Sequence, residues 1–296
     1  MTHVATLICD PASPCLTDAA LARAAQAVGA LPAAARWLAP GIAADIPVTA
    51  AQAPGAREKI IAALAGLPAD IVVQPVAQRR KKLLLADMDS TMIGQECIDE
   101  LAGFVGRKAH VAAITERAMR GEIAFEPALR ERVALLRGLS ADIVERVIAE
   151  RITLTPGGRA LVRTMRAHGA YTALVSGGFT LFTARIGAMI GFDEDRANHL
   201  DVADGVFAGT VREPILGRQA KLDTLTALRA AHGLARAETL CVGDGANDLA
   251  MLGEAGLGVA YHAKPAVAAA AHARIDNGDL TALLFAQGYR LEEFTA

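Results

Sequence analysis

Residues 83–92 read LLLADMDSTM, a run of four apolar residues that leads into two aspartates separated by one methionine. Such a short apolar run indicates a buried strand. If the strand geometry continues to its tip, Asp87 and Asp89 project to the same side. Adjacent carboxylates repel each other, so a proton, a metal ion or a cation must compensate them. The alternative is a pair of turn caps, because Asp-Ser-Thr is common in turns.

The composition indicates a globular protein that acts on small molecules. The chain has 296 residues, of which 53% are hydrophobic, enough for one large core or two modest ones. The formal net charge is −2 with mixed signs throughout, so there is no basic face for a nucleic acid and no polybasic arm for anionic lipid. We therefore expect no nucleic-acid partner and no membrane partner.

The cysteines and the apolar runs predict a cytoplasmic protein. No CxxC or Cys/His metal spacing relates Cys9, Cys15, Cys97 and Cys241, so we expect unpaired packing residues in a reducing compartment. Charge or glycine interrupts every apolar run before the ~18 residues that a spanning helix needs. The first residues, MTHVATLICDP, lack the basic segment of a signal peptide.

The order of predicted strands and helices indicates that residues 1–76 form a separate small unit. Their order of periodic segments is β-α-β-(β)-α-β, compatible with a ferredoxin-like α+β sandwich, and the first helix should begin at Thr17 or Asp18. No catalytic cluster occurs in this unit. Residues 77–82, which include QRRKK, are predicted to be a solvated basic linker.

Residues 83–296 alternate strands with helices, which predicts an α/β domain with a parallel sheet covered on both faces. The clearest strands are KKLLLADMD, AYTALVSGG, ETLCVGDG and GLGVAY. Residues 94–151 show only amphipathic helical periods, with Ser140 and Asp142 as helix-start signals, and predict a helical cap over the first strand's end. Thr155 and Pro156 then predict an N-cap and first helical residue. Ligands should bind beyond the carboxyl ends of the strands.

Two further strand ends carry polar motifs. VSGGFT, residues 175–180, precedes a predicted helix and offers the Ser176 hydroxyl and the Gly177 amide as hydrogen-bond donors to a phosphate group. A simple turn would show the same residues and is the alternative. GDGANDLAML, residues 243–252, offers Asp244 and Asp248 as hard oxygen ligands for Mg²⁺, with Asn247 as a neutral partner. A cluster of turn caps is the alternative here.

Lys221 stands near a predicted helix start in GRQAKLDTLTALRAA. Most lysines are solvated, but a phosphoryl group among four aspartates needs fixed positive charge besides a metal ion. In their order along the chain, DMDST, VSGGF, Lys221 and GDGAND resemble the four motifs of haloacid dehalogenase-superfamily phosphatases, over about residues 81–286. Within that superfamily, DMDSTMIGQECIDELA, the helical cap and VSGGF look like the phosphoserine phosphatase family.

The resemblance implies a Rossmannoid parallel sheet with a helical-bundle cap after the first core strand. It also implies that Asp87 is the nucleophile and Asp89 the general acid/base. A serine alkoxide is a poor leaving group, so the chemistry also requires an acid that protonates it and later activates water. By the same resemblance, the Asp87 carboxylate, the Asp89 main-chain carbonyl and Asp244 would hold Mg²⁺, with Asp248 in support.

The resemblance further implies that Ser176, Gly177 and Lys221 hold the phosphate oxygens and that Asn247 orients the phosphate or the substrate. In the cap it assigns Glu96 to the substrate ammonium group and Phe125 to a lid contact. It assigns Arg132 in FEPALRERV to the substrate carboxylate, with Arg130 as a competitor one local shift away.

The leading hypothesis is a Mg²⁺-dependent phosphatase for O-phospho-L-serine, in the last step of L-serine biosynthesis. The same mechanism could serve phosphohomoserine or phosphothreonine, since one methylene changes binding by only ~1–3 kcal/mol. A second class is a serine-sensing regulatory protein, because residues 1–76 resemble the ACT-like domains of some phosphoserine phosphatases. The sequence is also compatible with a homodimer.

Overall fold

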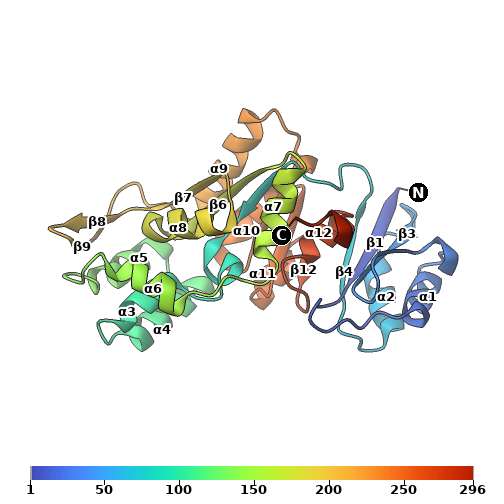
Figure 1. Ribbon diagram of the computed structural model, residues 1–296, viewed down its shortest axis with the longest axis horizontal. Coiled ribbons are helices and arrows are strands. Elements are labelled where there is room, and N and C mark those ends of the chain that lie inside the picture. Colours follow the sequence, from blue (N-terminus) through green and yellow to red (C-terminus); the bar gives the residue numbers. More distant parts are fainter. Residues whose placement is uncertain (1, 296) are drawn as a thin grey trace.

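The computed structural model describes residues 2–295, with an N-terminal unit at one end and a helical cap at the other (Figure 1). The N-terminal sheet has the strand order β2-β3-β1-β4, with antiparallel neighbours. The expected β-α-β-β-α-β order is confirmed. Thr17 caps the first helix by accepting a hydrogen bond from the Ala20 amide. The elements are β1 (His3–Ile8), α1 (Asp18–Ala27), β2 (Arg36–Ala39), β3 (Ala43–Val48), α2 (Ala56–Leu64) and β4 (Asp70–Pro75).

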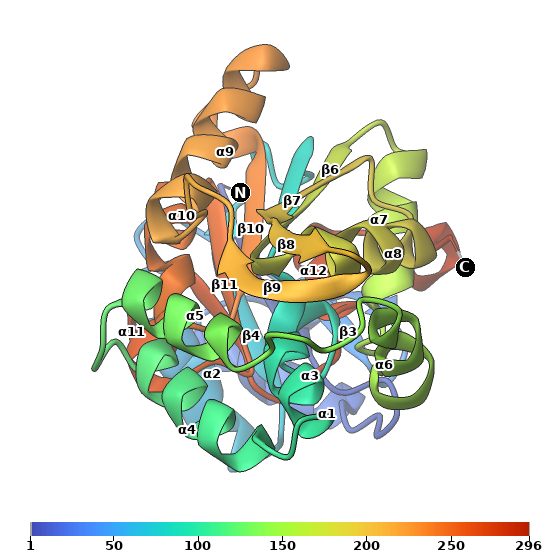
Figure 2. The same cartoon turned by 90° about the vertical axis from the view of Figure 1, so that its left-hand side faces the viewer.

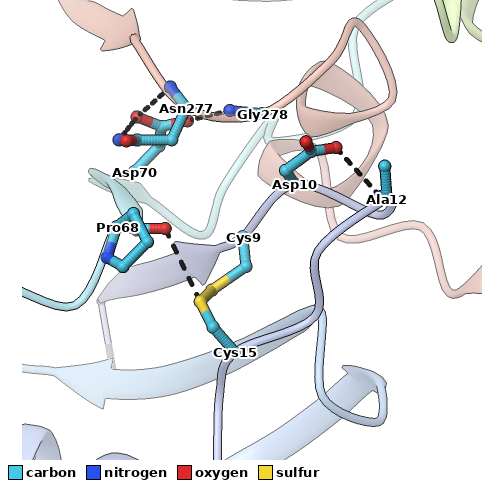
Figure 3. Close-up of a disulfide and its surroundings, with 8 residues drawn as sticks. All are labelled: Cys9, Asp10, Ala12, Cys15, Pro68, Asp70, Asn277 and Gly278. Atoms are coloured by element: carbon cyan, nitrogen blue, oxygen red, sulfur yellow. Dashed lines mark hydrogen bonds between the residues drawn. A yellow bond between two sulfur atoms is a disulfide. The ribbon is translucent and has the colours of Figure 1, made fainter.

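Cys9 and Cys15 form a disulfide, so the prediction of four unpaired cysteines is wrong for this pair (Figure 3). The β2–β3 turn brings the two together, because the Cys9 amide donates to the Ile42 carbonyl and the Cys15 amide to the Gly41 carbonyl. This proximity depends on tertiary contacts that the Cys9–Cys15 spacing does not encode. Cys97 and Cys241 are free and buried, as expected.

The basic segment between the two units is only partly solvated, because Gln78, Arg80 and Lys82 are exposed whereas Arg79 and Lys81 turn inward. The Arg79 guanidinium donates to the Asp45 carboxylate at 2.7 Å and to the Ala286 carbonyl at 2.7 Å, so it joins the N-terminal sheet to the C-terminal helix region. The Lys81 ammonium is buried and donates to the Gln78 and Ala237 carbonyls. Buried charge requires such partners, and this segment therefore fixes the two units together.

The second unit is built on a parallel sheet, as predicted, and its strand order is β12-β11-β10-β5-β6-β7. Side chains alternate along β5: Leu84 and Ala86 pack with α7, α8 and α12, whereas Leu83 and Leu85 pack with α9, α10 and α11. The sheet is therefore apolar on both faces. Its strands are β5 (Leu83–Ala86), β6 (Tyr171–Phe179), β7 (Glu194–Asn198), β10 (Thr239–Gly243), β11 (Leu257–Tyr261) and β12 (Ala273–Ile275).

The helix that follows the cap begins later than predicted. The helix after the cap begins at Gly158, with Gly157 at φ 78° before it, so the predicted N-cap at Thr155 and first residue at Pro156 are wrong. Thr155 instead accepts a turn hydrogen bond from the Gly158 amide through its carbonyl. The helices are α7 (Gly158–Ala167), α8 (Thr180–Ile190), α9 (Arg218–Ala231), α10 (Leu249–Glu254), α11 (Pro265–Ala270) and α12 (Ala282–Ala286).

The predicted cap is helical and follows β5, and it gains a hairpin that the sequence did not predict. The hairpin of β8 (Leu200–Ala203) and β9 (Val206–Val211) lies across the cap in Figure 2. The Gly138 amide donates to the Phe207 carbonyl and the Phe207 amide to the Leu139 carbonyl. The cap helices are α3 (Cys97–Gly103), α4 (Lys108–Met119), α5 (Phe125–Ala134) and α6 (Ile143–Arg151). Within residues 2–295, we find no helix with the length and apolarity to cross a membrane.

Asp70 ties β4 to the turn that follows β12 (Figure 3). Its buried carboxylate accepts from the amides of Asp276, Asn277 and Gly278 at 2.8–3.2 Å, and from the Asn277 side chain at 2.9 Å. A carboxylate that accepts several N–H groups is strongly held because each bond is charge-assisted. The contact joins segments about 200 residues apart in the chain.

We predict that Asp70→Ala lowers the free energy of unfolding by ~2–3 kcal/mol, because several N–H groups, including the buried Gly278 amide, lose a charged acceptor. Urea denaturation would measure the loss. Asp223→Ala is the control, since the Asp223 side chain is exposed on α9 and accepts from the exposed Gln219 side chain, and it should change stability by less than ~0.5 kcal/mol. Equal effects of the two substitutions would contradict the role given to the Asp70 contact.

Candidate active site

The loop after β5 fixes both aspartates of the DMD motif. The strand ends at Ala86, and the following residues form a tight turn in which Ser90 has φ 56°. The Asp87 carboxylate accepts from the Met88 amide at 2.7 Å, and that of Asp89 from the Cys97 amide at 2.9 Å, at the start of α3. Backbone donors therefore orient the carboxylates, and both line one cavity.

A buried lysine lies between two of the four predicted aspartates. Lys221 Nζ is 2.6 Å from Asp87 Oδ2 and 2.7 Å from Asp248 Oδ1, and its side chain is 2% exposed. Carboxylate oxygens of Asp87, Asp244 and Asp248 lie within 4.8 Å of one another. The expectation of a solvated lysine does not apply here, because the ammonium group neutralises part of a carboxylate cluster.

The electrostatics of this cluster leave room for a further cation. Burial, and then the Asp248 charge, raise the pKa of Asp244 well above its ordinary value. Burial and the Asp87 charge raise the pKa of Asp248 to about 7. Burial lowers the pKa of Lys221, but the negative charges of Asp248 and Asp87 outweigh this effect. The pKa of Lys221 is therefore raised, and the lysine stays charged. Three carboxylates with one ammonium fit a hard divalent cation that prefers oxygen ligands.

The loop that ends β6 approaches the same carboxylates. Ser176 Oγ donates to Asp89 Oδ2 at 3.2 Å and accepts from the Gly178 amide at 2.8 Å. A Cβ on Gly178 would lie 2.9 Å from Asp89 Oδ2, and one on Gly177 would lie 2.9 Å from the Phe125 ring. Both glycines are therefore required by close approach, and Phe125 of the cap packs against this loop.

Asn247 follows β10 and contacts the nucleophile candidate. Its Nδ2 donates to Asp87 Oδ2 at 3.3 Å. Its Oδ1 is the only buried side-chain polar atom within residues 2–295 without a hydrogen-bond partner. Buried polar atoms normally have partners, so this oxygen, on the wall of the cavity, points to a donor on a bound molecule.

The cavity has a volume of about 270 Å³. On its cap side, an acidic residue, Glu96, and a basic residue, Arg132, line it. Glu96 accepts from Ser90 Oγ at 2.7 Å, and burial followed by the Asp89 charge raises the pKa of its carboxyl well above the ordinary value. Arg132 is buried and lines the cavity. Arg130 is exposed on the outer side of α5, where it pairs with Glu213.

One residue that lines the cavity and one that supports its loops were not predicted from the sequence. Arg218 lines it one helical turn before Lys221, and that i, i+3 spacing was the available signal. Asn198 on β7 donates to the Gly177 carbonyl at 2.9 Å and accepts from the Leu216 amide at 2.7 Å, so it joins two loops of the site. No sequence signal identified Asn198, because β7 itself was not predicted.

The chain is similar to proteins of a known hydrolase family. The family model for haloacid dehalogenase-like hydrolases matches residues 84–253, more than half of the chain. The chain belongs to the haloacid dehalogenase-like hydrolases. This hydrolase is 45% identical over 228 residues to the phosphoserine phosphatase of Polaromonas sp., a match that covers 74% of this chain and 95% of the relative.

Two further matches agree with that family. Identity to the phosphoserine phosphatase of Streptomyces coelicolor is 42% over 235 residues, covering 79% of this chain but 57% of the longer relative. A solved phosphoserine phosphatase, described as a phospho-aspartyl intermediate analogue, matches with a TM-score of 0.66 and 39% identity. That likeness covers 70% of this chain and 98% of the solved one. The cap, the strands β6, β7 and β10 and the acidic cluster of this hydrolase lie within residues 84–253, which the family model matches.

We predict that Lys221→Met destabilises the hydrolase by ~3–5 kcal/mol at pH 8 in the presence of a chelator, because buried carboxylates lose their counter-ion. The loss should be smaller at pH 5. Burial raises the pKa of Asp244 and Asp248 in the folded state, so the folded protein binds more protons than the unfolded chain, and stability falls as pH rises.

Urea denaturation at both pH values would test this prediction. Lys82→Met is the control, because Lys82 is 62% exposed and pairs only with Glu238 at the surface. A loss for Lys221→Met that is the same at pH 5 and pH 8 would contradict the electrostatic explanation.

Proposed function

We propose that this hydrolase converts O-phospho-L-serine and water to L-serine and phosphate, with Mg²⁺ and through a phosphoaspartyl intermediate. The observation that carries the proposal is one cavity with two kinds of wall. Its floor has Asp87 and Asp89, and its cap side has Glu96 and Arg132. A phosphate ester with both an ammonium and a carboxylate group complements that arrangement. The reaction would be the last step of L-serine biosynthesis.

Asp87 is the proposed nucleophile. Its carboxylate lines the cavity and pairs with the Lys221 ammonium at 2.6 Å, and a carboxylate placed in this way can attack phosphorus. Asp89 is the proposed general acid and base. Burial, with the Asp87 charge, raises the pKa of Asp89 to about 6, close to the range in which one group can both donate and accept a proton. The Cys97 amide and the Ser176 hydroxyl hold Asp89 in position.

The proposed metal site uses Asp87, Asp244 and Asp248, with the Asp89 main-chain carbonyl. These oxygens suit Mg²⁺, which when bound would lower the repulsion between a phosphate dianion and an anionic nucleophile. Thr91 donates to Asp244 at 3.2 Å and thereby orients this ligand. Ser176, Gly177 and Lys221 are the proposed donors to phosphate oxygens, and Asn247 is the proposed orienting group.

Substrate choice is proposed to lie in the cap. Arg132 can bind a carboxylate with two parallel N–H donors, and Glu96 can accept from the ammonium group. Phe125 covers the loop that contains Gly177. Phosphohomoserine and phosphothreonine would use the same groups, so they are the alternative substrates of the same mechanism.

We also propose that residues 1–76 are an ACT-like domain, supported by the order of their elements and by the strand order β2-β3-β1-β4. The unit lies at the end of the molecule opposite the cap (Figure 1). A serine-sensing role would therefore act on the cavity through the phosphatase core. A cytoplasmic location and a homodimer are predictions from the sequence alone.

We predict different kinetic defects for the two catalytic aspartates. Asp87→Asn should form no phosphoenzyme, because an amide is a poor nucleophile. Asp89→Asn should still bind substrate but lose ~10²–10⁴-fold in both chemical steps, because proton transfer is removed. Rapid-quench measurement of the phosphoenzyme would separate the two. Turnover by either variant at the wild-type rate would refute the corresponding role.

Arg132→Ala should reduce kcat/KM for O-phospho-L-serine by ~100-fold, because a charged pair of hydrogen bonds is lost, and should spare an aryl phosphate. Wild-type phosphate release should need Mg²⁺ and favour phosphoserine over phosphohomoserine, phosphothreonine and the aryl phosphate. Arg130→Ala is the matched control on the same helix, outside the cavity.

These results can fail in distinct ways. Equal loss on phosphoserine and the aryl phosphate would indicate a collapsed cap instead of a lost carboxylate contact. Faster wild-type turnover of phosphohomoserine would overturn the serine assignment and keep the phosphatase mechanism. A defect in Arg130→Ala as large as that in Arg132→Ala would remove the reason for choosing Arg132.

A further inference from the structure

Three cap helices converge behind the Arg132 guanidinium. Arg132 lies on α5, and its Nη1 donates to Thr115 Oγ1 of α4 at 2.9 Å. The Thr115 hydroxyl in turn donates to Asp99 Oδ1 of α3 at 2.7 Å. Arg132 Nε donates to the Ala128 carbonyl, one turn back on its own helix, at 3.0 Å. These two hydrogen bonds, to Thr115 and to Ala128, hold the guanidinium against the cap helices.

The Thr115 hydroxyl has one proton and two acceptors within reach. Asp99 Oδ1 is at 2.7 Å and the Val111 carbonyl at 3.0 Å. The carboxylate is nearer and forms a charge-assisted bond, which is the stronger of the two. With its proton directed to Asp99, the hydroxyl presents a lone pair to Arg132. Asp99 therefore determines which way Thr115 faces.

This arrangement holds a buried cation without a direct ion pair. Within residues 2–295, the structure contains no ion pair of Arg132 with any carboxylate inside 4.0 Å. A guanidinium has five N–H donors, and the two protein hydrogen bonds occupy two of them. A carboxylate in direct contact would compete with a substrate carboxylate for this fork. A neutral hydroxyl orients the guanidinium and leaves the remaining donors for the cavity.

The electrostatic environment agrees with this geometry. Burial lowers the pKa of Arg132, and the largest opposing influence is the negative charge of Asp99, ahead of Glu96 and Asp89. Thr115 is 4% exposed and lines the cavity, whereas Asp99 is partly buried and does not line it. Asp99 therefore acts on the cavity only through Thr115 and through its charge.

We propose that Thr115 and Asp99 are positioning residues for substrate specificity: they orient the Arg132 guanidinium toward the carboxylate of the substrate. The inference rests on the proposed function, because it assumes that Arg132 binds a carboxylate. It predicts that their loss affects only substrates that carry this group. Neither residue touches the reacting atoms.

The test compares O-phospho-L-serine with O-phosphoethanolamine, which lacks only the carboxylate. Thr115→Val keeps the shape of the side chain and removes the hydroxyl. We expect it to lower kcat/KM for phosphoserine by ~10-fold, mainly through KM, since one hydrogen bond to a charged group is lost. Turnover of phosphoethanolamine should stay within about twofold of wild type. Thr115→Ser keeps the hydroxyl and should restore most of the phosphoserine activity.

Two further variants make the test independent of the folding of Thr115→Val. Asp99→Asn retains an acceptor but removes the charge, and we expect a smaller loss of the same substrate selectivity. Ser140→Ala is the control, because Ser140 is an exposed cap hydroxyl outside the cavity. Thermal unfolding of each variant would show whether the cap remains folded.

The outcomes separate this inference from the function on which it rests. If wild type prefers phosphoserine strongly and the folded Thr115 and Asp99 variants keep that preference, the positioning role is overturned and the substrate assignment stands. An equal loss on both substrates would also overturn it, since it would indicate a structural role. If wild type shows no preference, the assignment of Arg132 to a carboxylate fails, and the inference fails with it.

Discussion

The site depends on the neutralisation of buried carboxylates by Lys221. Asp87 and Asp248 each lie within 2.7 Å of its ammonium group, and the Asp244 carboxylate is close to both. The positive charge of Lys221 offsets part of the cost of burying these carboxylates. One lysine cannot balance three carboxylates, so the cluster retains excess negative charge that a divalent cation would compensate.

The parallel sheet makes this concentration of charge feasible. β5 and β10 are neighbours at its centre, so the loops with Asp87 and Asp244 meet at one edge, and the loop after β6 adds Ser176. Lys221 comes from α9, which packs on one face of the sheet. Hydrogen bonds within the loops, and glycines where backbone and carboxylate approach closely, then fix the side chains.

Sequence reasoning predicted the parallel sheet and the cap, because each follows from a contiguous periodic pattern. It also predicted the cluster of Asp87, Asp244 and Asp248, because parallel strands end at one edge of the sheet. It did not predict the disulfide, the buried Arg79 or the β8–β9 hairpin. Cys9 and Cys15 are only six residues apart, but the β2–β3 turn holds them together, and Arg79 and the hairpin likewise depend on contacts with distant residues. The helix predicted to start at Thr155 begins later because Gly157 adopts a left-handed conformation, and the turn-forming sequence Pro156-Gly157-Gly158 was the available signal.

The two buried cations of the site differ in their partners, and this difference separates their tasks. Lys221 contacts carboxylates directly, so its charge is paired within the protein, beside the proposed nucleophile. Arg132 donates to a hydroxyl and a carbonyl, and the Asp99 carboxylate lies behind that hydroxyl. The charge of Arg132 is therefore not paired directly with a carboxylate of the protein. Under the proposed roles, Lys221 serves the reacting groups and Arg132 serves the substrate anion, so selectivity can change without disturbing the chemistry.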